Sequence, residues 1–275
     1  MINLAICGIC GKMGKSVFNL AVNDEDFNVI FGVDKADGIF GGVPVCDRFE
    51  KAEKHTDKCG TKIINDKLTV DAIIDFSSPS ALKDLLLFAE KHKSALLLAT
   101  TGYSDNDFEI IKFYSEKIPI FYSQNLSSGL YSLINACKKI CDIFFDFDVE
   151  IIEKHHNEKK DAPSGTAIKI ANEISPLLNL KNKTDDANNL NAGCLGEKVN
   201  GIPVHSVRGG GIFGEHEVLF MSSDEIISVK HTALNRNLFA RSALNIAKFI
   251  AHMPSGLYGM DDYAEYVRRK KFQTL

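Results

Sequence analysis

The fold of this chain is decided by the stretch Ile2-Asn3-Leu4-Ala5-Ile6-Cys7-Gly8-Ile9-Cys10-Gly11-Lys12-Met13-Gly14. Its apolar beginning predicts a β-strand over Ile2–Cys7, and apolar residues then recur at helical spacing over Met13–Ala21. Between the two, small residues let the chain turn sharply and let a phosphate approach the backbone. The turn leaves unpaired N–H groups at the start of the helix, which suits the pyrophosphate of a dinucleotide.

An acidic residue follows at the spacing expected for a ribose partner. Asp34 lies twenty residues beyond the glycine turn, at the end of a second predicted strand, Asn28–Val33. Its carboxylate can accept hydrogen bonds from the hydroxyls of the adenosine ribose. The neighbouring Lys35 has two interpretations: it pairs with the 2′-phosphate of NADP, or it is a solvated lysine. The pattern therefore predicts a dinucleotide site without choosing between NADH and NADPH.

Short apolar runs alternate with amphipathic helical patterns through the first half of the chain. Further predicted strands are Ala72–Phe76, Ala95–Ala99 and Ile118–Tyr122, and apolar residues recur at helical spacing between Leu82 and Ala89. Strand–helix–strand repeats of this kind build a parallel sheet that is covered on both faces. The first half is therefore predicted to be an α/β domain with a Rossmann-like parallel sheet.

The second half has a different pattern, with predicted helices near Ser127–Ile143 and from about Ser164, and a strand at Val149–Glu153 between them. Three later runs look like antiparallel strands: Val204–Val207, Glu217–Met221 and Ile226–His231. We therefore expect a separate α+β domain from about residue 127. The polar stretch Asn179–Asn200 is expected to be an exposed loop, and the last helical pattern, Leu238–Ala251, is compatible with either domain.

The composition excludes several classes of protein. Among 275 residues, 32 are Lys or Arg and 36 are Asp or Glu, so the formal net charge is −4 and neither nucleic acid nor an anionic membrane is an expected partner. No apolar run approaches the roughly 18 residues of a membrane span, and no basic leader or cleavage site precedes the first strand, so export is not expected. The seven cysteines are scattered and odd in number, which indicates reduced thiols in a cytoplasm.

The densest group of reactive side chains lies between Glu153 and Thr166, from the end of a predicted strand to the start of a helix. Adjacent residues of an extended chain point to opposite sides, so His155 and His156 are not expected to chelate one metal, and no metal site is predicted. Imidazoles beside lysines suit proton donation and anion binding. The alternative interpretation is a solvated charged loop with a helix cap. A second polar set is compatible with turns and rim charges: Arg208-Gly209-Gly210, Gly214-Glu215-His216, His231 and Arg236.

This cluster resembles the signature of a known enzyme family. The pattern Glu153-x-His155-His156-x-x-Lys159-x-Asp161-Ala162-Pro163-Ser164-Gly165-Thr166-Ala167 is similar to that of 4-hydroxy-tetrahydrodipicolinate reductase, also called dihydrodipicolinate reductase. The resemblance covers most of the chain. Further segments that resemble the family are Gly8-x-x-Gly11-x-Met13-Gly14, Asp75-Phe76-Ser77, Thr100-Thr101-Gly102, Asn125-Leu126-Ser127, Val207-Arg208-Gly209-Gly210, Gly214-Glu215-His216 and Ser255-Gly256-Leu257-Tyr258.

The resemblance implies a reaction and a set of roles. A nicotinamide hydride, from NADH or NADPH, reduces a cyclic unsaturated dicarboxylic imine to tetrahydrodipicolinate on the route to diaminopimelate and lysine. His155 is the implied proton donor and acceptor, and Lys159 is a second proton donor. The implied substrate-binding residues are His156, Lys159, Ser164, Gly165 and Thr166. The implied cofactor-binding residues are Gly8, Ile9, Cys10, Gly11, Lys12, Met13, Asp34, Lys35, Ala99, Thr100, Thr101, Ser123, Gln124, Asn125 and Leu126.

The same resemblance implies an assembly. Residues 1–126 with 237–275 are expected to form the dinucleotide-binding domain, and residues 127–236 a substrate-binding domain that also joins the chains into a homotetramer. The sequence departs from the family pattern at Ala99, Gly211 and Ser242, which bears on turnover and cofactor preference more than on the type of reaction. Two alternatives stay open at this point: a related dehydrogenase of another small carboxylate, and a non-catalytic dinucleotide sensor.

Overall fold

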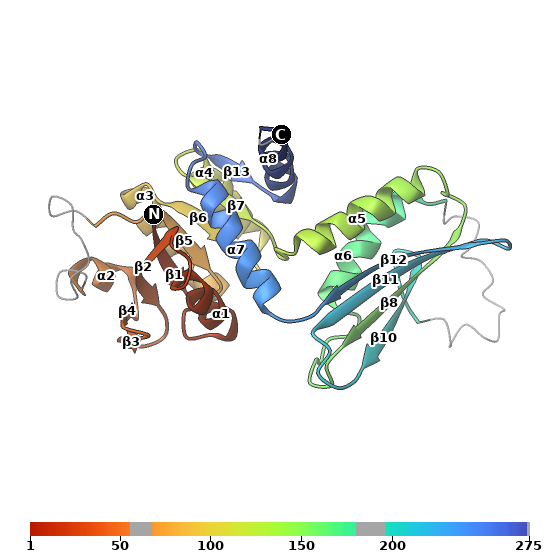
Figure 1. The fold of residues 1–275 in the computed structure, drawn as a ribbon, viewed down its shortest axis with the longest axis horizontal. Helices are drawn as coiled ribbons and strands as arrows, with labels where there is room; N and C mark the ends of the chain where they lie inside the picture. Colours follow the sequence, from red (N-terminus) through yellow and green to blue (C-terminus); the bar gives the residue numbers. More distant parts are fainter. Residues whose placement is uncertain (56–67, 180–195, 274–275) are drawn as a thin grey trace. The chain divides into compact units, whose positions relative to one another are not determined.

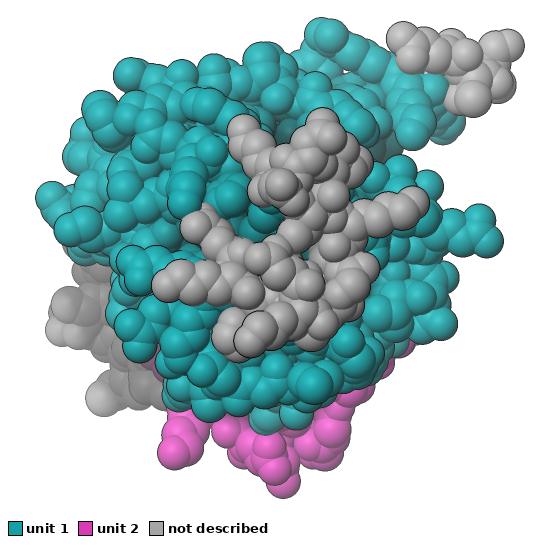
Figure 2. Space-filling view, turned by 90° about the vertical axis from the view of Figure 1, so that its left-hand side faces the viewer, with its two compact units in different colours: residues 1–126, 237–275 teal, residues 127–236 magenta. Residues whose placement is uncertain are grey.

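The computed structural model describes residues 1–55, 68–179 and 196–273. The chain divides into two compact units, coloured separately in Figure 2: unit 1 comprises Met1–Leu126 and Asn237–Leu275, and unit 2 comprises Ser127–Arg236. Each unit contains one β-sheet (Figure 1). Within the described stretches no helix is long and apolar enough to cross a membrane.

Unit 1 is built on an eight-stranded sheet in the order β13-β7-β6-β5-β1-β2-β4-β3. All neighbours pair in parallel except the edge strand β3, which is antiparallel to β4. The strands are β1 (Ile2–Cys7), β2 (Phe27–Val33), β3 (Gly38–Phe40), β4 (Val43–Cys46), β5 (Ala72–Asp75), β6 (Ala95–Leu98), β7 (Pro119–Tyr122) and β13 (Gly256–Tyr258). The predicted Rossmann-like parallel sheet is confirmed.

Helices cover both faces of this sheet, as parallel strands require. Their bounds are α1 (Lys12–Ala21), α2 (Phe49–His55), the 3₁₀ turn η2 (Pro79–Ala81), α3 (Leu82–His92), α4 (Asp105–Ser115), α7 (Asn237–Ile250) and α8 (Met260–Gln273). One apolar core joins Val17 of α1 to Ala243 and Ala247 of α7. A second core joins Leu85 of α3 to Ile111 of α4. The last helical pattern, which sequence alone left undecided, therefore packs within unit 1 as α7.

Unit 2 has one five-stranded sheet in the order β12-β11-β8-β10-β9. Its elements are α5 (Ser128–Cys141), β8 (Asp148–His155), α6 (Gly165–Ile174), the 3₁₀ turn η3 (Ser175–Leu177), β9 (Glu197–Val199), β10 (Ile202–Arg208), β11 (Gly214–Met221) and β12 (Ile226–Ala233). The apolar core lies between the sheet and the helices α5 and α6. Alternate residues of β8 and β11 are buried against that core, so the opposite face of the sheet has no covering element among the described residues of the unit.

Three expectations for unit 2 were wrong in whole or in part. β10 is antiparallel to β9, as expected, but it is parallel to β8, because β8, α6 and β10 form a strand–helix–strand crossover, and such crossovers connect parallel strands. β11 begins at Gly214, so the segment Gly214-Glu215-His216 belongs to a strand and not to a turn. Glu197–Val199, expected as loop, forms β9, whereas residues 180–195 of that expected loop lie outside the described part of the chain.

Candidate active site

Strand β8 ends in two buried side chains, Glu153 and His155, which share a face because they are two residues apart. Glu153 is fully buried, and its Oε2 lies 2.5 Å from Nδ1 of His155. Arg208, at the end of β10, donates to the two carboxylate oxygens of Glu153 over 2.7 and 2.8 Å. The backbone N–H of Ser164 donates to Oε1 over 3.1 Å. The parallel pairing of β8 with β10 brings Arg208 opposite His155 and so completes this group.

These contacts determine the charge of the pair. Burial alone would raise the pKa of the Glu153 carboxyl, but the hydrogen bonds that it accepts, above all from Arg208, outweigh burial and lower the pKa to about 2. Burial lowers the pKa of His155, and the carboxylate of Glu153 opposes this shift. At neutral pH the pair therefore combines a carboxylate that stays ionised, Glu153, with an imidazole that can exchange a proton, His155.

A second imidazole lies beside the first. His216, on β11, is 5% exposed, and its ring centroid lies 5.2 Å from that of His155. Its Nε2 is 3.2 Å from Oγ of Ser164. Burial, followed by the proximity of His155, lowers the pKa of His216 to about 3. His216 is therefore neutral at neutral pH.

The loop after β8 carries two further side chains that the sequence predicted for the site. Lys159 extends its ammonium to both carboxylate oxygens of Asp161, each 2.8 Å away. His156 follows the last residue of β8, and its Nδ1 is buried without a hydrogen-bond partner in the described part of the chain. A buried imidazole nitrogen without a partner is costly unless a ligand completes it.

The N-terminus of α6 closes the cluster. Ser164 is the N-cap residue, and its Oγ accepts a hydrogen bond from the N–H of Ala167 over 3.2 Å. Gly165 and Thr166 form the first turn of the helix, which contains no acidic side chain. The helix end therefore presents backbone N–H groups and a positive dipole end where an anion can bind.

Sequence reasoning gave no role to three members of this cluster, Glu153, Arg208 and His216, although each lies in a quoted segment. Of the second polar set, Arg208 and His216 join the cluster. His231 faces His216 across β11 and β12, and its Nε2 lies 3.3 Å from Oγ of Ser127. Arg236 lies 5.8 Å from the ring centroid of Phe213, a cation–π contact that does not involve the cluster.

In unit 1 the glycine turn lies where β1 is flanked by β5 and β2, the point at which the strand order reverses. Gly8 has φ +78°, and a Cβ there would lie 2.7 Å from the carbonyl oxygen of Phe76, so only glycine fits. The N–H of Cys10 donates to Oδ2 of Asp34 over 2.8 Å, which ties the turn to the end of β2. Gly11 caps α1 without a side chain, and the first turn of α1 contains no acidic residue. The N–H groups of Cys10 and Gly11 are donated within the protein, to Asp34 and to the carbonyl oxygen of Gly8, and those at the N-terminus of α1 form the cradle that fits a pyrophosphate.

The other predicted cofactor residues lie at the same edge of the sheet, because the carboxyl ends of parallel strands share one edge. Ala99, Thr100 and Thr101 follow β6, and Ser123, Gln124, Asn125 and Leu126 follow β7. Asp75, at the end of β5, is 1% exposed and accepts hydrogen bonds from Oγ of Ser77 (2.5 Å) and from the hydroxyl of Tyr103 (3.2 Å). Asp75 thus links the turns after β5 and β6, a function that sequence reasoning had not assigned to it.

A doubly wound sheet with an open glycine turn at its switch point, together with an imidazole–ammonium cluster at the end of a strand of a second sheet, is typical of a nicotinamide-dependent oxidoreductase. Sequence models described as dihydrodipicolinate reductase, N-terminus and C-terminus, match residues 2–126 and 129–263. The chain therefore belongs to the dihydrodipicolinate reductase family. Among the described residues, no three His, Cys, Asp or Glu side chains form a group that could hold a metal ion.

Individual relatives agree with the family match. A protein of Clostridium novyi named 4-hydroxy-tetrahydrodipicolinate reductase is 36% identical over 263 residues, which cover 95% of this chain and 98% of the relative. A protein of the same name from Caldanaerobacter subterraneus is 39% identical over 270 residues, with the same coverage. The solved dihydrodipicolinate reductase from Paenisporosarcina sp. TG-14 has a TM-score of 0.79 at 24% identity and covers 95% of this chain and 99% of its own, which shows the shared fold.

Proposed function

We propose that this chain reduces 4-hydroxy-tetrahydrodipicolinate to tetrahydrodipicolinate on the route to diaminopimelate and lysine. The substrate loses its 4-hydroxyl group as water, and the resulting conjugated imine gains one hydride and one proton. The nicotinamide, when bound, supplies the hydride and leaves as NAD(P)⁺. The protein must therefore hold a small dicarboxylate and supply one proton, and the observation that carries this proposal is the group formed by His155, Glu153 and Lys159.

In this proposal His155 donates and accepts the proton, and Lys159 is a second donor. The contact from Glu153 occupies Nδ1 of His155 and leaves Nε2 for the substrate. His156, Lys159 and the Ser164–Thr166 turn bind the two carboxylates through cationic or N–H donors. The buried Nδ1 of His156, which no described residue pairs, supports a ligand at this position.

The cofactor part of the proposal assigns unit 1 to NADH or NADPH. Residues Gly8 to Met13 bind the pyrophosphate, and Asp34 binds the adenosine ribose. The turns Ala99–Thr101 and Ser123–Leu126, at the carboxyl edge of the sheet, bind the nicotinamide end. The glycine cradle and the uncapped N-terminus of α1 support this assignment.

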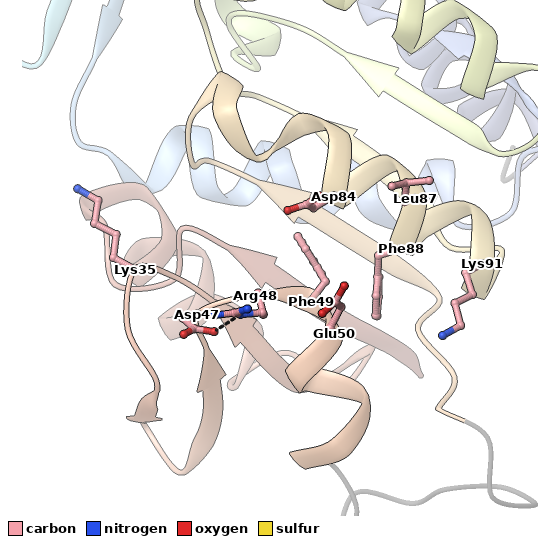
Figure 3. Close-up of a pocket in the computed structure, with 9 residues that line it drawn as sticks. All are labelled: Lys35, Asp47, Arg48, Phe49, Glu50, Asp84, Leu87, Phe88 and Lys91. Carbon is pink, nitrogen blue, oxygen red and sulfur yellow. Dashed lines mark hydrogen bonds and ion pairs between the residues drawn. The ribbon is translucent and has the colours of Figure 1, made fainter.

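We infer further that NADH is used at least as well as NADPH. Two cations that follow Asp34 have carboxylate partners: Arg48 pairs with Asp47 over 3.1 Å, and Lys51 pairs with Asp37 over 2.6 Å. Lys35 makes no ion pair with any described residue. It is one of the residues that line a cavity of about 660 Å³, and in Figure 3 its side chain extends away from the Asp47–Arg48 pair. One lysine beside the Asp34 carboxylate is weak compensation for the two charges of a 2′-phosphate.

The assembly is the last part of the proposal: a homotetramer in the cytoplasm, joined through the second sheet. The uncovered face of that sheet carries apolar side chains, among them Ile152, Leu219 and Ile226. Three of its charged side chains form one group, since Glu215 contacts Lys154 over 2.6 Å and Lys230 over 2.9 Å. A face with paired charges and apolar side chains suits contact with a second copy of the chain.

The proposal predicts that His155→Ala and Lys159→Ala each lower kcat at least about 100-fold, because each removes a positioned proton donor. Dinucleotide affinity, measured by fluorescence titration, should be unchanged in both variants, since the altered side chains belong to unit 2. The matched control is Lys160→Ala, which removes an exposed neighbouring lysine and should keep wild-type turnover. Wild-type kcat in both His155→Ala and Lys159→Ala would refute the assigned mechanism.

A further inference from the structure

The hydrogen bonds around Glu153 determine the protonation of its neighbour. Its carboxylate accepts from two guanidinium nitrogens of Arg208 and from the N–H of Ser164, and these groups can only donate. The hydroxyl of Ser206 also lowers the pKa of Glu153, as a donor to a carboxylate does. An ionised carboxylate can only accept, so the atom that lies 2.5 Å from Oε2 must donate. That atom is Nδ1 of His155.

We propose that Glu153 is a positioning residue that holds the imidazole of His155 in the tautomer protonated at Nδ1, so that Nε2 is the nitrogen that exchanges a proton with the substrate. The catalytic part of this inference rests on the function proposed above, whereas the tautomer does not. Arg208 complements Glu153, because its charge balances that of the buried carboxylate and keeps it ionised.

The surroundings of Nε2 support this arrangement. No described residue forms a hydrogen bond with Nε2 of His155, and Gly214 on β11 lies beside it. A Cβ at position 214 would lie 3.2 Å from Nε2, so the glycine leaves space for another group to reach this nitrogen. Around the imidazole, Glu153 comes from β8, Lys159 from the following loop, Arg208 from β10 and neutral His216 from β11. Glu153 is thus the one anion among these groups, and without it His155 would face the cations Lys159 and Arg208 and the neutral His216.

The direct test is the tautomer of His155 in the full chain. Protein labelled with ¹⁵N-histidine is examined by two-bond ¹⁵N–¹H correlation spectra above the titration of His155, and the signals of that ring are assigned by their loss in His155→Gln. We expect the neutral ring to carry its proton on Nδ1. A neutral ring protonated mainly on Nε2 would overturn the inference, whatever the activity of the enzyme.

Two kinetic comparisons extend the test. Glu153→Gln should lower kcat at least about tenfold with little change in the substrate KM. It should also move the alkaline limb of the kcat–pH profile to lower pH, because the protonated imidazole of His155 loses the anion that stabilises it. Glu173→Gln is the control, since it removes a carboxylate that pairs with Lys138 elsewhere in unit 2. An unchanged kcat profile in Glu153→Gln would contradict the positioning role.

A glycine pair covers the case in which Glu153→Gln does not fold. Gly214→Ala places a methyl group against Nε2 and should lower kcat at least about tenfold, whereas Gly38→Ala in unit 1, with no atom within 4 Å, should stay within about twofold of wild type. Full activity in Gly214→Ala would contradict Nε2 as the reacting nitrogen. If the wild-type chain does not reduce the substrate at all, the proposed function fails while the measured tautomer still decides the inference.

Discussion

Two imidazoles on neighbouring strands, His155 and His216, differ in their ionic surroundings although their rings are 5.2 Å apart. His155 has a carboxylate on one nitrogen and space at the other, which suits a group that exchanges protons. His216 is 5% exposed, faces Ser164, and has no carboxylate in direct contact among the described residues. Its pKa of about 3 makes it a neutral structural partner that does not compete for the proton of His155.

This difference predicts a loss of stability in acid. Between pH 6.5 and 3 the unfolded chain binds a proton at His216 that the folded chain does not bind, so the free energy of unfolding falls as the pH drops below 6.5. The loss attributable to His216 is about 2 kcal/mol at pH 5 relative to pH 7.

Urea unfolding at the two pH values measures this loss. His216→Asn should be less stable at pH 7 but should lose less stability between pH 7 and pH 5 than the wild type. Equal losses in wild type and variant would show that His216 is not buried in its neutral form.

The position of a single residue in the fold could be predicted only where the residues next to it in the sequence formed a recognisable strand, turn or helix pattern. The spacing placed Asp34 after the second strand, which is confirmed, and it ended the strand before the histidines at Glu153, whereas β8 continues to His155. Glu153 was visible as part of a pattern, yet its role depends on Arg208, which lies 55 residues away. Periodicity does not reveal which strands become neighbours, so the partners of a buried charge could not be predicted.

At the scale of elements, the contact between α1 and the glycine turn determines the shape of the cofactor cradle. A Cβ at Gly14 would lie 2.1 Å from the carbonyl oxygen of Gly8 and 2.6 Å from Cα of Ile9. The first turn of α1 therefore packs directly on the turn that precedes it, with no room for a side chain.

Gly14→Ala should push α1 away from the turn, which would cost about 1–3 kcal/mol of stability and lower dinucleotide affinity at least about tenfold. The control is Gly38→Ala, because a Cβ at Gly38 of unit 1 would have no atom within 4 Å. The affinity of each variant for NADH is measured by calorimetric titration. Equal affinities in the two variants would mean that close packing at Gly14 is not needed for binding.

The prediction of helices and strands succeeded where each strand is followed directly by a helix. It failed where a strand pairs with one that is distant in the sequence. Ile2–Cys7 matches β1 residue for residue, because the run is apolar and ends at glycine. The pairing of β10 was predicted only in part: the strand is antiparallel to β9 but parallel to β8, and a half-buried strand shows the same alternation in both kinds of pair. β11 was expected to start at Glu217 rather than Gly214, because a glycine followed by polar residues resembles a turn.

For the whole molecule, the uncovered face of the second sheet predicts self-association. Light scattering should give four chains per particle, and Leu219→Glu should reduce this number, because a charge would be buried in the interface. Leu87→Glu is the matched control, since it changes an exposed leucine of unit 1 and should leave the assembly intact. A monomeric wild type, or an intact tetramer in Leu219→Glu, would contradict the proposed interface.

The most direct test of the central claim is turnover by the wild-type chain. Dihydrodipicolinate synthase generates the substrate from pyruvate and aspartate semialdehyde, and the loss of reduced-nicotinamide absorbance is followed with NADH and NADPH in parallel. We predict oxidation of both nucleotides that depends on the synthase product, with kcat/KM for NADH at least equal to that for NADPH. A folded chain that binds NADH but oxidises neither nucleotide in the presence of this substrate would contradict the proposed reaction.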